Sequence, residues 1–267
     1  KLIKANNLFE IKRGTRRGWN KLFYPEEGHG IESEYIKPVV RSSSEIDGYI
    51  TNAKSEAFCC TLSKEKLADL GHTGALNWIR SFKNKTNNVG VPLTESLDKP
   101  GIYWYTMLPN TLADMVLSIN PDERLFLAKL KERSFVDQRL TRFTKKKDNT
   151  NIELTHALLN SLIGIFYIEA LGFGRGLGAL DLNTTKIKKN LFMLNPNLLN
   201  EKQKGEITKK FSLLVERDVL PLNKELQSKD RIDFDNAVLE AYGIKKYKKD
   251  IKNSLLQLYS IRKSVNN

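Results

Sequence analysis

The stretch Leu154–Leu171, with the sequence LTHALLNSLIGIFYIEAL, repeats its large apolar residues at a spacing close to the 3.6 residues of a helical turn. It predicts a buried helix, and we expect that helix to end at Gly172 because glycine is common after a last helical turn. The part without charge, Leu154–Ile168, is shorter than the roughly 18–20 apolar residues of a membrane span. We therefore expect no membrane segment here.

The sequences on the two sides of this helix differ in character. After it, further helices are expected over Ile207–Val215, Phe234–Tyr242 and Ile251–Arg262, the second capped by Asp233 and ended by Gly243. Before it, short apolar runs separated by Ser, Asn, Gly and Pro predict short strands. These runs are Leu8–Ile11, Leu22–Tyr24, Tyr35–Val40, Tyr49–Ile50, Ala57–Leu62, Ile102–Met107, Leu125–Leu130 and Phe135–Phe143. Short helices are expected at Ser63–Leu70 and Thr73–Ser81.

This order predicts an α/β fold of the α+β kind, an irregular mixed β-sheet followed by a helical C-terminal part. The Lys-rich stretch Lys145–Asn151 is the best boundary, which gives a β-rich region over residues 1–147 and a helix-rich part over 148–267. Pro38 predicts an edge or a bulge for its strand, because proline cannot donate to a sheet ladder.

The charge of the chain points to a nucleic-acid partner. Its 267 residues hold 44 Lys and Arg against 31 Asp and Glu, a net charge of +13 and a pI near 9.5. Basic residues cluster at Lys12–Lys21, Lys129–Lys147 and Lys245–Lys263. The last of these runs is typical of a solvated helical tail. The first cluster is rich in Arg and interleaved with Gly, Trp and Asn. Arg and Asn can contact base edges with two hydrogen bonds, whereas Lys mainly neutralises phosphate.

Motifs of catalysis are missing from the sequence. The only cysteines, Cys59 and Cys60, adjoin each other, and the histidines stand singly, so neither a disulfide framework nor a zinc site is predicted. A common metal-dependent nuclease needs an acid that is followed by Glu-x-Lys, but Glu10 and Lys12, which have this spacing, come before the candidate acid Asp122. The sequence contains neither the Gly-x-Ser-x-Gly motif of hydrolases nor the Asp/Asn-Pro-Pro-Tyr motif of amino-methyltransferases. GFGRGLG at Gly172–Gly178 fits no nucleotide-binding pattern. Its glycines indicate either close backbone approach or a phosphate-facing loop that carries Arg175.

Several segments together resemble the target recognition domain of adenine-specific DNA methyltransferases from bacterial restriction–modification systems, including fused restriction–methylation enzymes. The segments are NNLFEIKRGTRRGWNKLFYP (Asn6–Pro25), IESEYIKPVVRSSSEI (Ile31–Ile46), Trp104–Tyr105, RSFVDQRLTRF (Arg133–Phe143) and Leu154–Pro196. Within the first two, Gly14, Gly18, Asn20 and Phe23, and then Glu32 or Glu34 followed by Pro38 and Arg41, match the family pattern. The Leu-Asn-Ser helix module also recurs in the specificity subunits of type I restriction enzymes. The resemblance covers roughly residues 8–240.

With no disulfide framework and no signal-peptide pattern, the sequence predicts a cytoplasmic protein. The resemblance implies a division of labour in a bacterial enzyme. An upstream region, fused or on a separate subunit, would bind S-adenosylmethionine and methylate a flipped adenine, with an endonuclease possible in the same protein. This chain would hold double-stranded DNA and choose the site, with no cofactor or metal of its own. A start at Lys1, with no Met, fits a chain cut from something longer. Alternatives are a non-enzymatic specificity subunit of a type I-like complex, or a single-strand binder that stacks bases on Trp19 and Tyr24.

Candidate DNA-binding residues follow from the clusters and the resemblance together. Those expected near bases are Arg13, Thr15, Arg16, Arg17, Trp19 and Asn20, then Arg41 with Ser42, Ser43 and Ser44. Lys12 and Lys21 flank the first group, and the expected phosphate contacts are Lys83, Lys85, Arg139, Arg142, Lys145 and Arg175. Arg139 and Arg142 are expected to point outward from a strand. Trp19 has an alternative role beneath the loop, where it would set the loop's shape, and Trp104 and Tyr105 are expected in a core.

Overall fold

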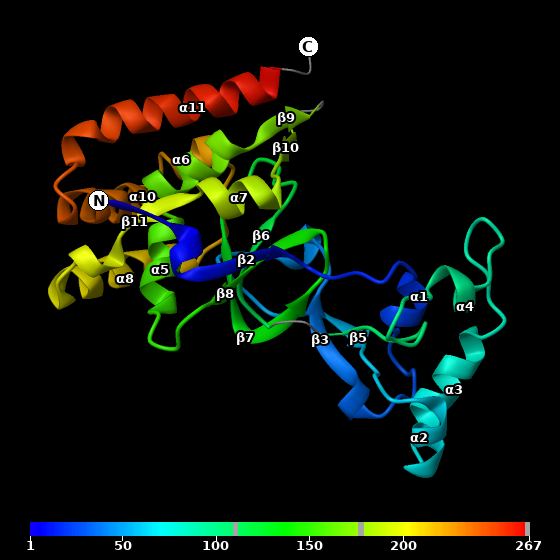
Figure 1. Cartoon of the computed structure of the whole chain (residues 1–267). Helices are drawn as coiled ribbons and strands as arrows, with labels where there is room; N and C mark the ends of the chain where they lie inside the picture. The colour runs from blue at the N-terminus through cyan, green and yellow to red at the C-terminus, as the bar shows by residue number, and fades with distance from the viewer. Residues whose placement is uncertain (109–111, 176–178, 265–267) are drawn as a thin grey trace.

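A mixed sheet of seven strands lies between a layer of helices and a smaller lobe (Figure 1). The computed structural model describes residues 1–108, 112–175 and 179–264. The strand order is β2-β8-β6-β7-β3-β5, and β4 pairs with the first part of β7. The strands are β2 Phe9–Arg13, β3 Ile36–Val40, β4 Ile50–Thr51, β5 Ser55–Phe58, β6 Ala113–Ser118, β7 Ala128–Val136 and β8 Leu140–Lys145. The predicted irregular mixed sheet is confirmed.

The sheet curls because β7 changes partners along its length. Its register against β6 shifts between the pairs of Ala113 and Met115, and its parallel partner changes from β4 to β3. The curled strands enclose a small core that includes Val40, Val116 and Val136. Pro38 is paired only toward β5, since the pairing of β3 with β7 begins at Val39. Its missing N–H is therefore tolerated in a strand that has two neighbours.

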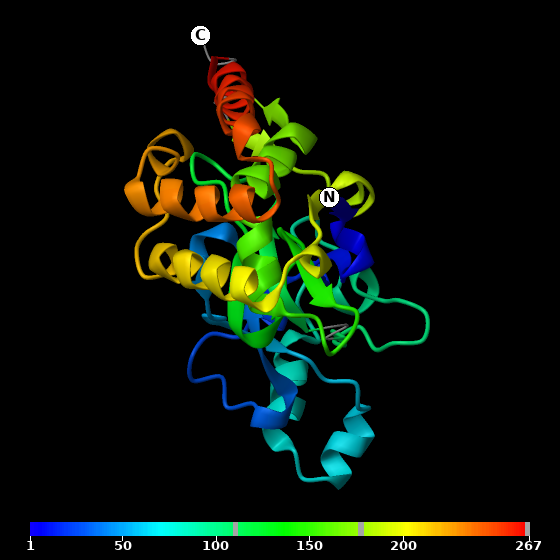
Figure 2. The same ribbon diagram turned by 90° about the vertical axis from the view of Figure 1, so that its left-hand side faces the viewer.

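A layer of helices covers one face of the sheet. It consists of α5 Ile152–Leu159, α6 Leu162–Leu171, α7 Thr184–Asn190, α8 Glu201–Val215, α9 Leu222–Glu225, α10 Lys229–Ala241 and α11 Lys248–Ser264. In Figure 2, α8 (yellow) and α10 (orange) lie in front of the green helices α5 and α6. The largest core joins Phe9, Ile11 and Phe143 of the sheet to apolar residues of these helices. The two regions expected from the sequence thus share one core.

Two small strand pairs complete this part of the molecule. β1 Leu2–Lys4 pairs with β11 Phe192–Leu194, which fastens the N-terminal segment to the helical layer. β9 Phe173–Arg175 pairs with β10 Ala179–Asp181, so the described part of the Gly172–Gly178 segment is a hairpin. A Cβ on Gly172 would lie 2.4 Å from the Leu180 side chain, which supports the interpretation of close backbone approach. Residues 176–178 of that segment lie outside the described residues.

The smaller lobe projects from the sheet at β3 and β5 (Figure 1). It holds α1 Asn20–Phe23, α2 Lys64–Asp69, α3 Thr73–Phe82 and α4 Leu93–Ser96, and we call it the small lobe. Its own core includes Leu22, Leu67, Ile79 and Tyr105. Cys59 and Cys60 are buried in the same core. The predicted helices at Ser63–Leu70 and Thr73–Ser81 are confirmed as α2 and α3.

The single long helix predicted from Leu154 is wrong, since it is broken into α5 and α6 with a bend of 62°. The side chain of Asn160 accepts a hydrogen bond from the N–H of Leu127 and donates to its carbonyl, both at 2.9 Å. Ser161 then caps α6 by accepting from the N–H of Gly164 at 3.4 Å. Among the described residues, no single helix is long and apolar enough to cross a membrane, and only this bent pair reaches that length together.

Other boundaries also differ from those predicted. Leu22–Tyr24 is mostly helical, and Ile102–Met107 forms turns around buried Tyr105. The expected strand Phe135–Phe143 is interrupted by the turn between β7 and β8 at residues 137–139. Helix α10 begins after Ser228, well before Asp233, because its first turn is set by contacts with Arg217. Gly172 ends α6 with an extended backbone, and Gly243 follows α10 with a φ of 62°.

Candidate nucleic-acid interface

Four of the side chains expected to contact DNA meet around one shallow recess. Arg16, Asn20, Arg41 and Arg139 line it together with Tyr24 and Asp137. They come from three segments that are far apart in the sequence: the connection from β2 to α1, the end of β3, and the turn between β7 and β8. Figure 1 shows the first of these segments crossing from the sheet to the small lobe.

Glycine at position 14 allows the connection from β2 to lie against the β7–β8 turn. The N–H of Gly14 donates to the carbonyl of Leu140 at 3.0 Å, and the N–H of Thr15 donates to that of Val136 at 2.9 Å. A Cβ on Gly14 would lie 2.2 Å from the carbonyl oxygen of Asp137. No other residue type fits there without moving backbone, so this glycine places Arg16 beside the turn.

Asp137 organises the turn from its buried position. It is 4% exposed, its carboxylate accepts from the N–H of Arg139 at 3.0 Å, and it also accepts from the hydroxyl of Tyr24. Burial and this hydrogen bond raise the pKa of the Tyr24 phenol far above its ordinary value, so the hydroxyl keeps its proton and donates. Asp137 therefore fixes both the turn and the aromatic ring at the floor of the recess.

The arginines of the recess are not paired with acidic side chains among the described residues. The guanidinium of Arg41 lies 4.4 Å from the centre of the Tyr24 ring, within the range of a cation–π contact. Within the described ranges, the side chains of Arg16, Arg41 and Arg139 have no carboxylate within ion-pair distance and no hydrogen-bond acceptor. Three cations around one occupied carboxylate leave a local positive charge that favours an anionic or hydrogen-bond-accepting ligand.

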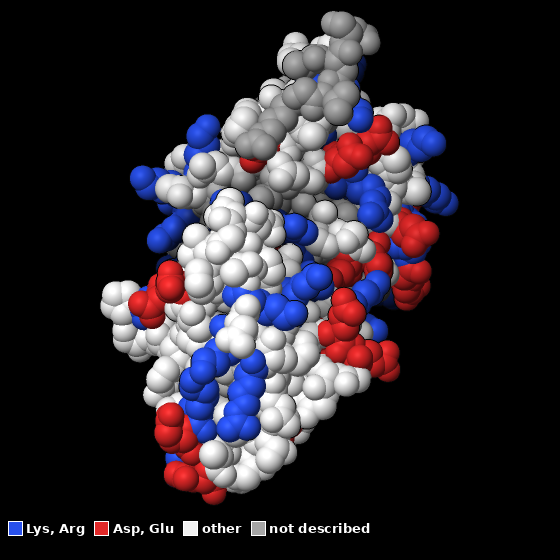
Figure 3. Space-filling model, turned by 90° about the vertical axis from the view of Figure 1, so that its right-hand side faces the viewer, with Lys and Arg blue, Asp and Glu red and all other residues white. Residues whose placement is uncertain are grey.

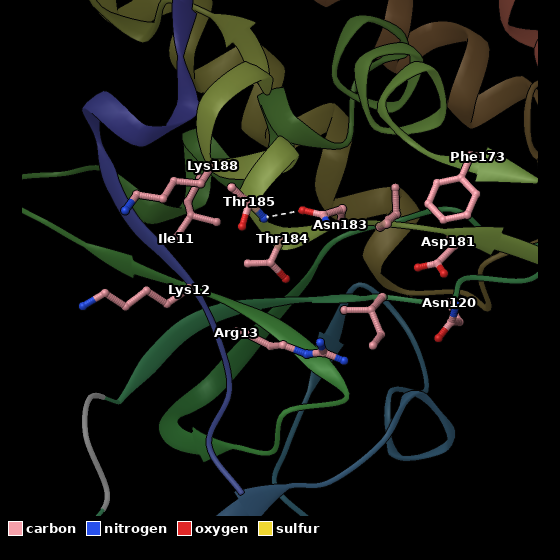
Figure 4. Close-up of a pocket in the computed structure, with 12 residues that line it drawn as sticks. Ile11, Lys12, Arg13, Asn120, Phe173, Asp181, Asn183, Thr184, Thr185 and Lys188 are labelled. Atoms are coloured by element: carbon pink, nitrogen blue, oxygen red, sulfur yellow. Dashed lines mark hydrogen bonds between the residues drawn. The ribbon is translucent and has the colours of Figure 1, made fainter.

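A larger cleft adjoins this recess along the edge strand β2. It has a volume of about 550 Å³ and holds Lys12 and Arg13 on one side and Asn183, Thr185 and Lys188 on the other (Figure 4). The Nε atom of Arg13 donates to the carbonyl of Gln138 at 2.6 Å, which joins the cleft to the β7–β8 turn. The Nζ atom of Lys12 lies 2.5 Å from Glu10.

A second cleft shares the lining residue Asn120 with the cleft along β2. Its volume is about 420 Å³, and Ser43 and Ser44 are among its lining residues. The hydroxyls of Ser42 and Ser44 hydrogen-bond to each other at 2.6 Å. The predicted residues 41–44 therefore connect the recess to this second cleft.

Basic side chains are also gathered on the small lobe. Lys64, Arg80 and Lys83 line a hollow of about 350 Å³ beside Trp104. Figure 3 shows the face that carries this lobe, with Lys and Arg side chains in its middle and acidic side chains mostly nearer its edges. Lys85 is exposed just beyond α3, and Lys21 is exposed on α1. These charges suit contacts to a phosphate backbone.

The structure corrects the prediction at Arg17 and Arg142, which are both buried. Arg17 donates to the carbonyls of Leu97 and Trp104, at 2.5 and 3.3 Å, so its guanidinium holds the small lobe together and does not face outward. Burial lowers the pKa of Arg17. Arg142 lies 3.1 Å from Glu10 and donates to Thr144, because β8 is an inner strand between β2 and β6.

Other predicted residues lie away from the recess. Lys145 is at the opposite end of β8, 3.4 Å from Asp148. Trp19 packs against the core of the small lobe, in agreement with its alternative role of shaping the loop. Arg175 lies in β9 beside the residues that are not described. Tyr105 is buried and Trp104 partly buried, as expected.

Some residues that organise these sites lie outside the set predicted from the sequence. Asp137 was hidden in a run taken as one strand, although an acid between Arg133 and Arg139 is the kind of residue that ends a strand in a turn. Arg80 and Lys64 carried no signal in their sequence spacing, and Tyr24 was expected only as a stacking surface for a single-stranded ligand. No group of three or more His, Cys, Asp or Glu that could hold a metal ion occurs in the part of the chain that the structure describes.

The fold of this chain is similar to parts of solved structures, although its sequence matches no known family. No protein-family model matches the sequence, and no curated protein does. Among solved structures, the chain resembles the type IIG restriction endonuclease BpuSI, with a TM-score of 0.62 over 99% of this chain at 12% identity. It also matches the S subunit of a type I restriction-modification system from M. genitalium, with a TM-score of 0.38 over 85% of this chain at 12% identity. The chain spans 31% of the first and 40% of the second. The chain therefore shares the fold of part of a type IIG restriction endonuclease, as the resemblance predicted.

Proposed function

We propose that this chain is the region of a restriction–modification enzyme that recognises a specific sequence in double-stranded DNA. The observation that carries the proposal is the meeting of Arg16, Asn20, Arg41 and Arg139 around Asp137 and Tyr24. Arg and Asn are the side chains that read base edges best, and here their donors converge from distant segments. The basic residues of the small lobe and of the β2 cleft would hold the phosphates on either side.

The fold supports this proposal, since it is shared with part of BpuSI, a restriction endonuclease. We further propose that a catalytic region, fused upstream or on a separate subunit, binds S-adenosylmethionine and methylates adenine at the chosen site. In that arrangement this chain supplies no catalytic group and selects the position of the base. A type I-like specificity subunit would use the same surface and differ only in its partners.

The deciding experiment is a selection of bound duplexes from a random pool, performed with the whole protein at about 150 mM salt, where nonspecific binding is weak. We expect enrichment of one short sequence that contains adenine. If about five phosphates are contacted, the logarithm of the binding constant should fall with the logarithm of salt concentration with a slope of roughly −4.5. Binding without enrichment, or equal competition by single strands, would contradict the proposal.

A second assay distinguishes a fused methyltransferase from a separate specificity subunit. The selected duplex is incubated with the protein and radiolabelled S-adenosylmethionine, and the label on DNA is counted. Transfer to adenine by the same polypeptide would establish a fused methyltransferase. Transfer only after addition of a separate chain would establish a specificity subunit. A duplex with the selected adenine replaced is the matched control.

A further inference from the structure

We infer that Arg41 reads a guanine in the target sequence, and that Tyr24 and Asp137 are the positioning residues that hold it ready to do so. This inference rests on the proposed function and assigns one base of the recognised sequence to one side chain. Its starting observation is that the Arg41 guanidinium lies 4.4 Å from the centre of the Tyr24 ring while none of its donors is used within the described residues.

The backbone of Arg41 is fixed from two sides. Its N–H donates to Oε2 of Glu45 at 3.0 Å, and the carbonyl of the preceding Val40 accepts from the N–H of Asp137 at 3.0 Å. The other carboxylate oxygen of Glu45 accepts from Ser55 at 2.8 Å. Glu45 thus holds the main chain at position 41 and lies beyond ion-pair distance of the guanidinium.

The side chain is oriented by an aromatic ring that is itself locked. The Tyr24 hydroxyl donates to the buried Asp137, whose other oxygen is occupied by the N–H of Arg139. Asp137 is therefore engaged by a neutral partner and a backbone group, and it does not draw Arg41 into an ion pair. The guanidinium lines the recess, where its contact with the Tyr24 ring limits the positions that it can take.

A restrained guanidinium with unused donors suits a base more than a phosphate. Phosphate contacts need only charge, and exposed flexible cations such as Arg139 and Lys83 supply it. The planar guanidinium presents two parallel N–H donors, which match the O6 and N7 acceptors of guanine in the major groove. Ordering the side chain in advance also lowers the entropy that binding must overcome. Arg41 combines these properties, whereas Arg139 is exposed and has no cation–π contact with any aromatic residue that the structure describes.

The test compares variants in the random-duplex selection. Arg41→Lys keeps the charge but loses the paired donors, so we expect the preference for guanine at one position to fall by roughly 5- to 150-fold, the equivalent of about 1–3 kcal/mol. The salt slope should stay within about 0.5 of the wild-type value, because no phosphate contact is lost. Arg133→Lys is the matched control, because Arg133 is exposed and does not line the recess, and it should leave that position unchanged.

Tyr24→Phe provides an independent arm, because it keeps the ring and removes only the bond to Asp137. We expect a smaller loss of preference at the same guanine. The thermal unfolding midpoint of each variant is measured first, and Arg41→Lys decides the test if Tyr24→Phe proves unstable. A uniform loss of affinity with an unchanged selected sequence would overturn the inference and make Arg41 a phosphate contact. Absence of any selected sequence for the wild-type protein would instead overturn the proposed function.

Discussion

Replacing Gly14 by alanine tests whether one close backbone contact builds the interface. The added Cβ would lie 2.2 Å from the carbonyl oxygen of Asp137 and 2.3 Å from that of Val136. Both neighbours are main-chain atoms of the β7–β8 turn, so they cannot turn aside as a flexible side chain would. To reach ordinary contact, the connection after β2 must move away from the turn by about 1 Å, since real Cβ contacts lie near 3.4 Å or more.

The expected cost follows from what this movement disturbs. Overpacking a well-packed site costs about 1–3 kcal/mol. The movement also strains the hydrogen bonds from Gly14 to Leu140 and from Thr15 to Val136, each worth about 1 kcal/mol. Together these effects predict a loss of about 3–5 kcal/mol in the free energy of unfolding. For a chain of this size the thermal midpoint should fall by roughly 10 °C.

The assay is urea unfolding followed by circular dichroism, with the affinity for the selected duplex measured on the folded protein. Gly48→Ala is the matched control, because nothing lies within 4 Å of a Cβ at Gly48 and its φ is not in the left-handed region. We expect it to change stability by less than about 0.5 kcal/mol. A Gly14→Ala protein within about 1 kcal/mol of the wild type, with unchanged DNA affinity, would show that this backbone contact does not build the interface.

Three further predictions concern the small lobe, the sheet and the helical layer. Lys83→Ala and Arg80→Ala should each weaken binding equally on all duplexes and reduce the salt slope by about 0.9, and a change in the selected sequence would show instead that they read bases. Arg142→Ala should lower the free energy of unfolding by about 1–3 kcal/mol, because Glu10 and Thr144 lose their partner, and urea titration measures this loss. Burial lowers the pKa of His156 from 6.5 to about 3. Between these two pH values, His156 is protonated in the unfolded chain and neutral in the folded chain. Stability should therefore fall by about 1.4 kcal/mol per pH unit as the pH drops from about 6.5 toward 3, and urea titrations of His156→Gln should show a flatter dependence if this group is responsible.

Local patterns in the sequence were sufficient for those parts of the fold that local interactions stabilise. Helices α2 and α3 follow from their spacing and from the Ser63 cap, whose hydroxyl accepts from the N–H of Lys66 at 3.1 Å. Gly243 ends α10 because its φ of 62° disfavours other residues. The clustering of Arg and Gly after β2 likewise identified the segment that reaches the recess.

The interrupted helix shows where local pattern fails. Asn160 and Ser161 fit a helical period as well as their neighbours do, yet the chain turns there by 62°. The Asn160 amide satisfies both backbone groups of Leu127, a residue more than thirty positions away. Such a partner cannot be found from periodicity, because it is chosen by the packing of the sheet against α5 and not by the helix itself.

The neighbours Arg16 and Arg17 show the difference between what can be predicted from the sequence and what depends on the tertiary structure. Two adjacent arginines between Gly14 and Gly18 can be found in the sequence, and so can the positive charge that they concentrate there. Their different roles appear only in the folded chain, where Arg17 turns inward to the carbonyls of Leu97 and Trp104 while Arg16 lines the recess. A buried guanidinium needs carbonyl or carboxylate partners. The carbonyls that Arg17 uses belong to Leu97 and Trp104, which are far away in the sequence and come beside Arg17 only when the chain folds.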